Sequence, residues 1–444
     1  METKHVSPKM MASFSPFNRL DADELFLLAG RTEIRNAHYG DLLVKIGDSA
    51  NKSLYLLQGK LLVRARDGKE SFIDTRDIVP REPISHLVPH NYDVVCMSDV
   101  HYFLVNHKVI ENTLTRFNTP ANSAEVHHVD ESCFADELFT EIYEDLIEDN
   151  LSLPRIVDLE AEVQMRIDAN APVSSIVPLL IMDPSMAAYI MRMANSPIFV
   201  HRERANTLGT ALKKIYSRKE LSAIIHRASK SLYVPFEDKL YKNLSRVWRQ
   251  GLEVGVIASK LISRSSGLDP DVAFNYGLFH NIGMYLVYLY AYQRVNTVDD
   301  SELPQTVMRL HKDVARIVLK RWNFPGEYIE LVDLVDDWGR SGTDAIDYTD
   351  ALTLARVLSF LGKNYNRDTP PVDPDQLPRD ISKVPSLAKF GFTSENPDKL
   401  LDFLTGCRKN VAEYQNNVVS LGGVREFRGT PGDRSVVIGI NRSA

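Results

Sequence analysis

The spacing of apolar residues changes once along this chain, near residue 120, and that change constrains the fold more than any other feature. Before it, short apolar runs alternate with Gly-Asp and Ser-Asp pairs, which are typical of turns between strands. After it, apolar residues recur every three or four positions, as they do on the buried face of an α-helix. A chain of 444 residues also exceeds what one ordinary hydrophobic core holds. The sequence therefore predicts a multidomain α+β protein, with a β-rich domain followed by an all-α domain.

The β-rich domain is predicted over residues 1–120. Its clearest signal is SLYLLQGKLLVRARDGKESFI, where two extended runs flank Asp67-Gly68, a pair that tolerates positive φ and therefore favours a hairpin. The segments HYGDLLVKIGD and YDVVCMSDVHYFLV predict further short strands on either side of that hairpin. Residues 121–140 are polar with few apolar positions, and we predict that they form a linker.

The helical part opens two of its helices in the same way, with Asp183-Pro184 and Asp269-Pro270. In each pair the aspartate can cap the helix, and the proline fits its first turn. The second helix is predicted to carry one apolar face through Ala273, Tyr276, His280, Met284 and Val287. We predict a main helical domain over residues 141–345, a C-terminal helical extension over 346–415 and a flexible tail over 416–444.

Composition and charge exclude several classes of protein. A formal net charge of −7 argues against a chain that coats nucleic acid or an anionic membrane. Cys96, Cys133 and Cys407 lie far apart with no CxxC pair, which excludes a disulfide framework and a cysteine zinc cluster. The apolar run MYLVYLYAY is far shorter than the roughly 20 residues of a membrane-spanning helix, and the first residues lack a signal-peptide core. We expect a cytoplasmic protein with no membrane insertion and no nucleic-acid partner.

The run HYGDLLVKIGDSANKSLYLLQGKLLVRARDG resembles the cyclic nucleotide-binding domain, a cupin-like β-roll, through Gly40-Asp41, Gly47-Asp48 and Tyr55 to Gly59. In that family the ligand phosphate is held by a cassette with a Gly-Glu pair and an arginine followed by small residues. The corresponding region here, RDIVPREPISHLVPHNYDVV, contains neither element. Arg76 and Arg81 are the phosphate candidates that remain, although each is as easily a solvated loop charge. The resemblance implies a degenerate β-roll kept for protein contacts.

The stretch DPSMAAYIMRMANSPIF, with LPRIVDL upstream and TLGTALKKIYSRKELSAII downstream, resembles the HDOD domain. Leu153-Pro154, Asp183-Pro184 and Ala194-Asn195-Ser196 fill the characteristic places of that family. We take Asp183, Pro184, Asn195 and Ser196 as its signature residues. Asn195 and Ser196 are expected to cap the end of their helix or to brace the loop that follows. The resemblance extends over residues 151–337.

HDOD domains are related to HD phosphohydrolases, whose metals are held by a His, a His-Asp pair and a distant Asp. By position, Gln250 stands where the first His is expected, and His280-Asn281 stands where the pair is expected. An amide keeps the shape of aspartate but supplies no charge, so it is a far poorer ligand for a catalytic cation. The distant position is offered by Asp333, Asp336 and Asp337. The resemblance therefore implies no catalytic residue, no metal and no cofactor.

The ordinary interpretation of His280 is a hydrogen-bonded core histidine, with Gly277 and Gly283 permitting close helix packing. A mixed set of zinc-ligand types also occurs in the linker, but adjacent histidines point apart and no second half of a site is visible. We therefore expect no metal at His127, His128, Asp130 and Cys133.

Together these features predict a non-enzymatic bacterial signal-transduction scaffold or regulator that acts through protein–protein contacts of its HDOD domain. The resemblance implies partners such as kinases, response regulators or cyclic-di-nucleotide turnover proteins, and a homo-oligomer is compatible with the sequence. The candidate contact surfaces are the aromatic cluster Tyr285 to Tyr292 and the acidic stretch Glu137 to Asp149. The alternatives left open are a divergent HD-type metal-dependent phosphohydrolase or phosphodiesterase, and a cyclic-nucleotide-responsive sensor.

Overall fold

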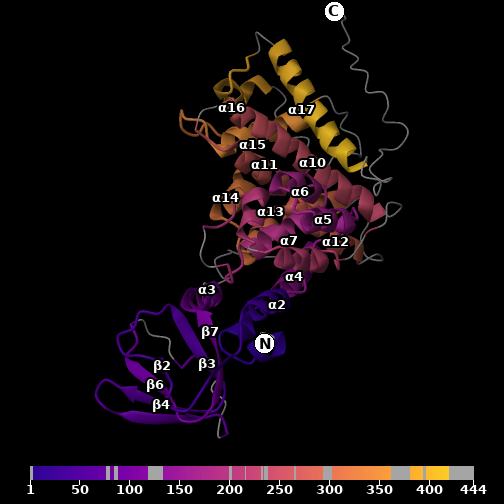
Figure 1. Cartoon of the computed structure of the whole chain (residues 1–444). Coiled ribbons are helices and arrows are strands. Elements are labelled where there is room, and N and C mark those ends of the chain that lie inside the picture. Colours follow the sequence, from indigo (N-terminus) through magenta and orange to yellow (C-terminus); the bar gives the residue numbers. More distant parts are fainter. Residues whose placement is uncertain are drawn as a thin grey trace, which may run out of the picture. The chain divides into compact units, whose positions relative to one another are not determined.

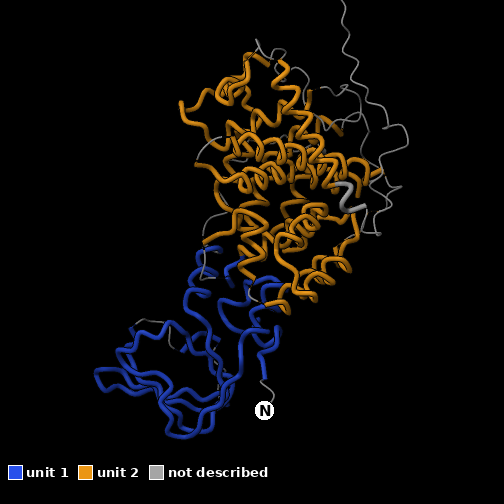
Figure 2. The backbone as a smooth tube through the Cα atoms, turned by 45° about the horizontal axis from the view of Figure 1, so that its top comes forward, with its two compact units in different colours: residues 1–125, 196–202 blue, residues 126–195, 203–444 orange. Residues whose placement is uncertain are grey.

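The computed structural model describes residues 4–76, 81–84, 89–118, 134–199, 203–215, 217–231, 234, 239–264, 267–293, 303–361, 381–393 and 397–419. The chain divides into two compact units, which Figure 2 draws in different colours. Unit 1 contains residues 1–125 together with 196–202, and unit 2 contains residues 126–195 and 203–444. Unit 1 is thus discontinuous along the chain, because its second piece interrupts the sequence of unit 2.

Unit 1 contains two antiparallel β-sheets, as the turn signals predicted (Figure 1). One sheet has the strand order β1 (Arg35–Ala37), β7 (Val100–Asn106), β3 (Lys52–Gln58). The other has the order β2 (Leu42–Val44), β6 (Tyr92–Cys96), β4 (Lys60–Ala65), β5 (Glu70–Asp74). The predicted hairpin at Asp67-Gly68 is confirmed, since β4 and β5 pair in register and Gly68 has a φ of 83°. The described residues of unit 1 also include four short helical segments: α1 (Pro8–Met11), η1 (Phe17–Arg19), α2 (Ala22–Arg31) and α3 (His107–Asn118).

Strand β3 is buried on both of its faces. Leu54 and Leu56 point into an apolar cluster that also contains Leu61 and Val94. Tyr55 points the opposite way and stacks on Phe103, with ring centroids 4.9 Å apart. Because side chains alternate between the two faces of a strand, this one strand supports two separate apolar layers of unit 1.

Unit 2 is helical, and the long helix α10 lies at its centre (Figure 1). Helices α11, α12, α15 and α17 all pack against it. The elements of the unit are α4 (Phe134–Ile147), α5 (Glu160–Asp168), α6 (Val173–Leu180), α7 (Pro184–Ala194), α8 (Leu208–Lys214), α9 (Arg218–Ala228), α10 (Lys239–Ile262), α11 (Pro270–Phe279), α12 (Ile282–Gln293), α13 (Leu303–Arg321), α14 (Gly326–Leu334), α15 (Tyr348–Phe360), η3 (Ile381–Lys383), α16 (Pro385–Lys389) and α17 (Pro397–Val419). Among the helices of the described ranges, none is both long and apolar enough to cross a membrane.

Glycines bring the central helices together, as predicted for Gly277 and Gly283. A Cβ atom added to Gly277 of α11 would lie 2.5 Å from the Cα of Gly255 on α10. A Cβ atom added to Gly283 of α12 would overlap the main-chain oxygen of His311 on α13. Any larger residue at these two positions would therefore have to push the helices apart.

The predicted single helix through His280 is wrong. Helix α11 ends at Phe279, and α12 begins at Ile282, so His280 and Asn281 form the turn between two helices. Apolar spacing could not locate this break, because both helices are buried on nearly all sides and keep their apolar period across it. Both residues of the turn are themselves buried.

The boundary between the predicted linker and the helical domain also differs. Helix α4 begins at Phe134, inside the stretch 121–140 that was assigned to the linker. Leu138, Ile142 and Leu146 give it a buried face, which the neighbouring acidic residues obscured. Residues 121–133, with the candidate ligands His127, His128, Asp130 and Cys133, lie outside the described residues, as does the tail from residue 420. The extension 346–415 contains α15, η3, α16 and most of α17.

Candidate functional site

Gln250 and Asn281, which the resemblance to HD enzymes assigns to metal-ligand positions, lie in direct contact. The side-chain nitrogen of Asn281 donates a 3.1 Å hydrogen bond to Oε1 of Gln250. Both side chains are buried, and they come from α10 and from the turn between α11 and α12. The fold thus brings together two positions that the resemblance assigns to one metal site, and two neutral amides form a hydrogen bond there.

His280 is a buried histidine with one hydrogen bond, as predicted. Its Nδ1 lies 2.6 Å from the main-chain oxygen of Gly277, so this nitrogen carries the proton and donates it. Burial lowers the pKa of His280 to about 3, so the ring is neutral at ordinary pH. The other nitrogen, Nε2, is buried without a hydrogen-bond partner among the described residues.

Arg356 of α15 places a fixed positive charge beside these groups. Its guanidinium lies 3.4 Å from Oδ1 of Asp336, and Lys312 lies 3.5 Å from Oδ2 of the same carboxylate. The Arg356 side chain is 1% exposed. Burial, and to a smaller extent the Arg356 charge, lowers the pKa of His280 and that of His311, to about 4 for His311. We call Gln250, His280, Asn281, His311, Asp336 and Arg356 the remnant centre.

The three aspartates proposed for the distant ligand position have different surroundings. Asp336 joins the remnant centre, where the charge of Arg356 helps to hold the pKa of its carboxyl below the usual value, against the effect of burial. Asp333 instead forms a partly exposed ion pair with Arg316, at 2.6 Å. Asp337 is exposed, and its main-chain oxygen accepts a 3.2 Å hydrogen bond from the main-chain nitrogen of Arg340.

The remnant centre does not fit the metal of an HD enzyme. Such a site needs neutral imidazoles and carboxylates together, without a competing positive charge. Here two of the positions are amides, and the carboxylate of Asp336 is already paired with Arg356 and Lys312. In the part of the chain that the structure describes, no three His, Cys, Asp or Glu side chains gather as metal ligands. The polar contacts join α10 to the turn between α11 and α12 through Gln250 and Asn281, and they join α13 to α15 through Asp336.

Asn195 closes the base of a loop, which confirms the prediction that it braces the loop after α7. Its Oδ1 accepts a 2.7 Å hydrogen bond from the main-chain nitrogen of Ala205, and its Nδ2 donates to the oxygen of Ala205 at 2.9 Å. The main-chain oxygen of Asn195 also accepts from the side chain of Asn323, at 2.5 Å. The chain that leaves α7 at Asn195 therefore comes back beside Asn195 at Ala205.

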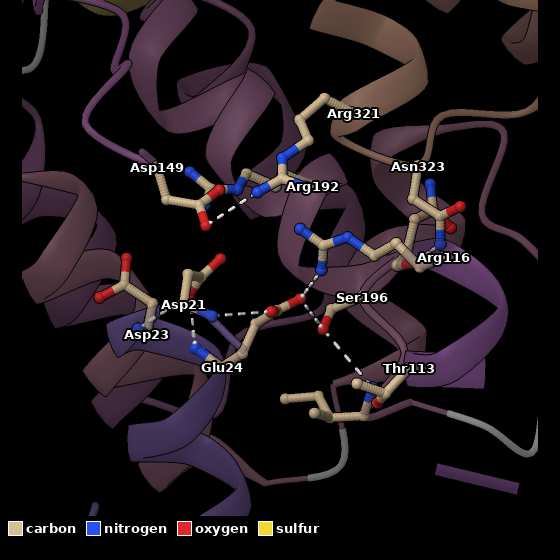
Figure 3. Close-up of polar contacts among 12 residues, drawn as sticks. Asp21, Asp23, Glu24, Thr113, Arg116, Asp149, Arg192, Ser196, Arg321 and Asn323 are labelled. Carbon is tan, nitrogen blue, oxygen red and sulfur yellow. Dashed lines mark hydrogen bonds and ion pairs between the residues drawn. The ribbon is translucent and has the colours of Figure 1, made fainter. Parts of the chain in front are cut away.

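Ser196, the next signature residue, belongs to unit 1 and contacts Glu24 (Figure 3). Its hydroxyl donates a 2.6 Å hydrogen bond to Oε1 of Glu24, which also accepts from Arg116 at 2.7 Å. The second oxygen, Oε2, accepts from the main-chain nitrogen of Asp21 at 3.2 Å, in a capping box at the start of α2. The Glu24 side chain is only 3% exposed. A buried carboxylate with these three donors is well stabilised, so it fixes Ser196 firmly in unit 1.

The same segment has a second contact within unit 1, because the Arg31 guanidinium lies 4.2 Å from the ring centre of Phe199. Sequence reasoning missed Glu24, Arg31 and Arg116 altogether. The only local signal was the spacing of Asp21 and Glu24, which is that of a capping box. That spacing explains a helix start and gives no indication of a partner so far along the chain.

Asp183 caps α7, as its place before Pro184 predicted. Its Oδ1 accepts from the main-chain nitrogen of Met186 at 2.9 Å, and its Oδ2 accepts from that of Val157 at 3.4 Å. The side chain is completely buried, and this burial raises the pKa of Asp183 to about 7. The signature aspartate thus ties the start of α7 to the chain before α5.

The candidate phosphate residues of the β-rich unit lie at its surface. Arg76 is 83% exposed and forms an ion pair with Asp74, at 2.6 Å. Arg81 is exposed as well. Both positions agree with solvated loop charges, and phosphate binding by either residue stays a prediction.

The predicted aromatic contact surface is wrong for most of its members. Tyr285, Tyr288 and Tyr290 are buried, because α12 packs against α10, α13 and α4. The hydroxyl of Tyr290 donates to Asp145 of α4 at 2.6 Å. Tyrosines that alternate with aliphatic residues suggest an exposed aromatic surface. Here they belong to α12, a helix that other helices enclose.

The acidic stretch of α4 is partly used inside unit 2. Within the stretch Glu137 to Asp149, Asp145 accepts a 2.6 Å hydrogen bond from Tyr290, and Asp149, which follows the helix, pairs with Arg321 at 3.0 Å (Figure 3 shows this pair). Glu144 and Glu148 remain exposed. The candidates for an acidic contact surface are therefore the exposed side chains of this stretch.

Comparison with known proteins places a family match on the helical part. Residues 153–337 match the HDOD domain. Among solved structures, the chain is similar to the MmoQ response regulator of Methylococcus capsulatus, with 16% identity, a TM-score of 0.43, and coverage of 56% of this chain and 98% of that one. It is similar to an HDOD domain protein of unknown function from Geobacter sulfurreducens, with 17% identity, a TM-score of 0.31, and coverage of 61% and 98%.

The β-rich part is similar to a cyclic nucleotide-binding-like protein from Brucella abortus. The identity is 13% and the TM-score 0.18, with coverage of 24% of this chain and 97% of that one. No curated protein sequence matches the chain.

Proposed function

We propose that this chain is a non-enzymatic signal-transduction regulator that acts through protein–protein contacts of its HDOD region, residues 153–337. The observation that carries the proposal is the hydrogen bond between Asn281 and Gln250, at two positions where an HD enzyme would hold its metal. Arg356 supports it, because a buried guanidinium beside Asp336 repels a divalent cation. The remnant centre then serves the stability of the helical unit, and function lies on the surface.

The mechanism we propose is conformational. Unit 1 includes residues 196–202, and the HDOD match includes them too. An event that changes unit 1 near Glu24 would release or shift Ser196, which is bonded covalently to Asn195 at the end of α7. The partners would be other signalling proteins, such as kinases, response regulators or cyclic-di-nucleotide turnover proteins. They would bind the surface of the HDOD region with different affinity when Ser196 is held by Glu24 and when it is released.

Metal analysis of the purified full chain tests the non-enzymatic part of the proposal. We expect substoichiometric transition metal and no hydrolysis of bis(p-nitrophenyl) phosphate in the presence of Mn²⁺, Mg²⁺ or Fe²⁺. Stoichiometric metal that is lost on His280→Ala but kept on His226→Ala, together with hydrolysis, would overturn it. His226 is a suitable control because it is an exposed histidine of α9 that pairs with Glu160.

An affinity capture tests the regulatory part. The wild-type chain and a Glu24→Gln variant would be used as baits in lysate of the cells that encode the protein. We expect signalling proteins among the captured partners, at levels that differ between the two baits, because the variant weakens the contact with Ser196. Equal capture by both baits would contradict the proposed mechanism, and partners of purely metabolic function would contradict the proposed role.

A further inference from the structure

Unit 2 contains a polar pocket that is separate from the remnant centre. Its volume is about 350 Å³, and its lining comprises Arg204, Asn206, Tyr276, Pro325, Gly326 and Glu327. The hydroxyl of Tyr328 donates to the main-chain oxygen of Asn206 at 2.7 Å, which fixes that wall of the pocket to α14. A volume of this size is at the lower end of the range for small-molecule sites.

Two opposite charges line the pocket without neutralising each other. Arg204 and Glu327 are both exposed, and neither forms a hydrogen bond or an ion pair within the described ranges. A guanidinium presents a planar set of N–H donors that suits a carboxylate or a phosphate. The carboxylate of Glu327 suits an ammonium group and would repel a ligand that is purely anionic. The pair therefore favours a ligand that carries both signs of charge.

Tyr276 supplies a neutral polar group in the same pocket. Its side chain is 5% exposed, and its hydroxyl has no hydrogen-bond partner in the part of the chain that the structure describes. Burial raises the pKa of Tyr276 well above the ordinary value, so the phenol keeps its proton. Its ring is fixed edge-on against Tyr328 and Tyr348, with centroids 4.5 Å and 5.4 Å away. The hydroxyl oxygen is not sealed from solvent, so it is accessible to a ligand in the pocket.

The start of helix α14 offers a second group, besides Arg204, that attracts the anionic end of a ligand. Helix α14 begins at Gly326 after Pro325, and no side chain caps its first turn. The space beside Gly326 is open, since a Cβ atom added there would meet nothing within 4 Å. Uncapped N–H groups at a helix start favour an anion, and Arg204 lines the same pocket.

We propose that this pocket binds a small zwitterion of the free amino-acid type. Arg204 and the start of α14 hold its carboxylate, and Glu327 holds its ammonium group. The Tyr276 hydroxyl and the Asn206 side chain offer hydrogen bonds to the rest of the ligand. Because the six lining residues are mainly polar, the ligand is small and polar itself.

Titration calorimetry and thermal unfolding of the full chain test this site. The probes are the standard amino acids, each at millimolar concentration, with inorganic phosphate as the anion-only probe and ammonium chloride as the cation-only probe. We expect at least one amino acid to raise the melting temperature in a dose-dependent way, because a ligand that binds only the folded state stabilises it. Phosphate and ammonium chloride should leave it unchanged at the same ionic strength.

Variants locate the binding. Arg204→Gln and Glu327→Gln should each weaken binding about tenfold or more, since each removes a charged hydrogen-bond partner. Tyr276→Phe keeps the ring contacts and should weaken binding less. The matched controls are Arg218→Gln and Glu330→Gln, which change exposed charges of α9 and α14 outside the pocket lining.

Three results would overturn the inference: no amino acid binds, phosphate alone binds as well as any amino acid, or the pocket variants bind like the controls. Circular dichroism of each variant confirms that it is folded. The assay measures neither metal content nor hydrolysis nor partner capture, so its failure is distinguishable from failure of the proposed regulatory role.

Discussion

The hydroxyl of Ser196 donates a 2.6 Å hydrogen bond to Oε1 of Glu24, and 172 positions of the chain separate the two residues. The same oxygen accepts from Arg116, so one buried carboxylate holds both an arginine of α3 and a signature residue of the HDOD region. The contact makes the segment after α7 part of the β-rich unit. It is the feature on which the proposed mechanism depends most.

Removal of this carboxylate should destabilise unit 1. In Glu24→Ala, Arg116 is left as a buried charge without its carboxylate, and we expect a loss of about 3 kcal/mol in the free energy of unfolding. Ser196→Ala should cost about 1 kcal/mol, because the pair with Arg116 survives. Urea denaturation measures both changes. Glu33→Ala alters an exposed glutamate next to α2 and should be neutral; equal effects at positions 24 and 33 would disprove the role of Glu24.

Asp183 should make stability depend on pH. Its carboxyl has a pKa of about 7 in the folded chain against 3.8 ordinarily, because burial disfavours the charged form. The folded state therefore binds more protons than the unfolded state in this interval, and its stability decreases as the pH rises from 3.8 to about 7.

The Asp183→Asn variant isolates that contribution. Its amide oxygen can still accept from Met186, but it does not titrate. We expect the difference in unfolding free energy between variant and wild type to shift in favour of the variant as the pH is raised across this interval. Urea midpoints at several pH values measure the difference, and a constant difference would show that Asp183 is ionised throughout.

Gly283→Ala should loosen the contact between α12 and α13. The new methyl group would overlap the main-chain oxygen of His311, so the helices must separate, at a cost of about 2 kcal/mol. Gly406→Ala is the matched control in α17, where the space beside the glycine is open. That change should be neutral or stabilising by up to about 1 kcal/mol. Thermal unfolding compares the two, and similar shifts would contradict the close packing at Gly283.

Arg356→Met should destabilise the helical unit by about 3 kcal/mol or more, because it removes a buried charge partner of Asp336. Arg316→Met is the control. Arg316 also pairs with an aspartate, at 2.6 Å, but that pair is partly exposed and should contribute less than about 1 kcal/mol. Chemical denaturation of both variants measures the contrast. A small effect at Arg356 would mean that the remnant centre can lose its internal cation and remain packed.

Local features of the fold were predictable from the sequence. The Asp67-Gly68 turn and the caps at Asp183 and Asp269 each depend on residues only a few positions apart. The break at His280 and Asn281 was not predictable, because enclosed helices have no polar face to mark where they end. Burial of Tyr290 was missed for the same reason.

The candidate site was predictable only in part. Gln250 and Asn281 came from the family resemblance, and the structure brings them together. Arg356 gave no signal, since arginine in a helix is usually solvated, and its burial depends on Asp336 from another element. The partnership of Ser196 and Glu24 is a tertiary contact between distant positions, which no local spacing encodes.

The discontinuity of unit 1 has a practical consequence for dissection of the protein. A fragment that starts after residue 125 keeps Ser196 and Phe199 but lacks Glu24, Arg31 and Arg116. In that fragment the Ser196 hydroxyl would lose its hydrogen bond to Glu24, and the Phe199 ring would lose its contact with Arg31 and become exposed to water. Studies of the HDOD region in isolation would therefore observe a surface that the intact chain does not present.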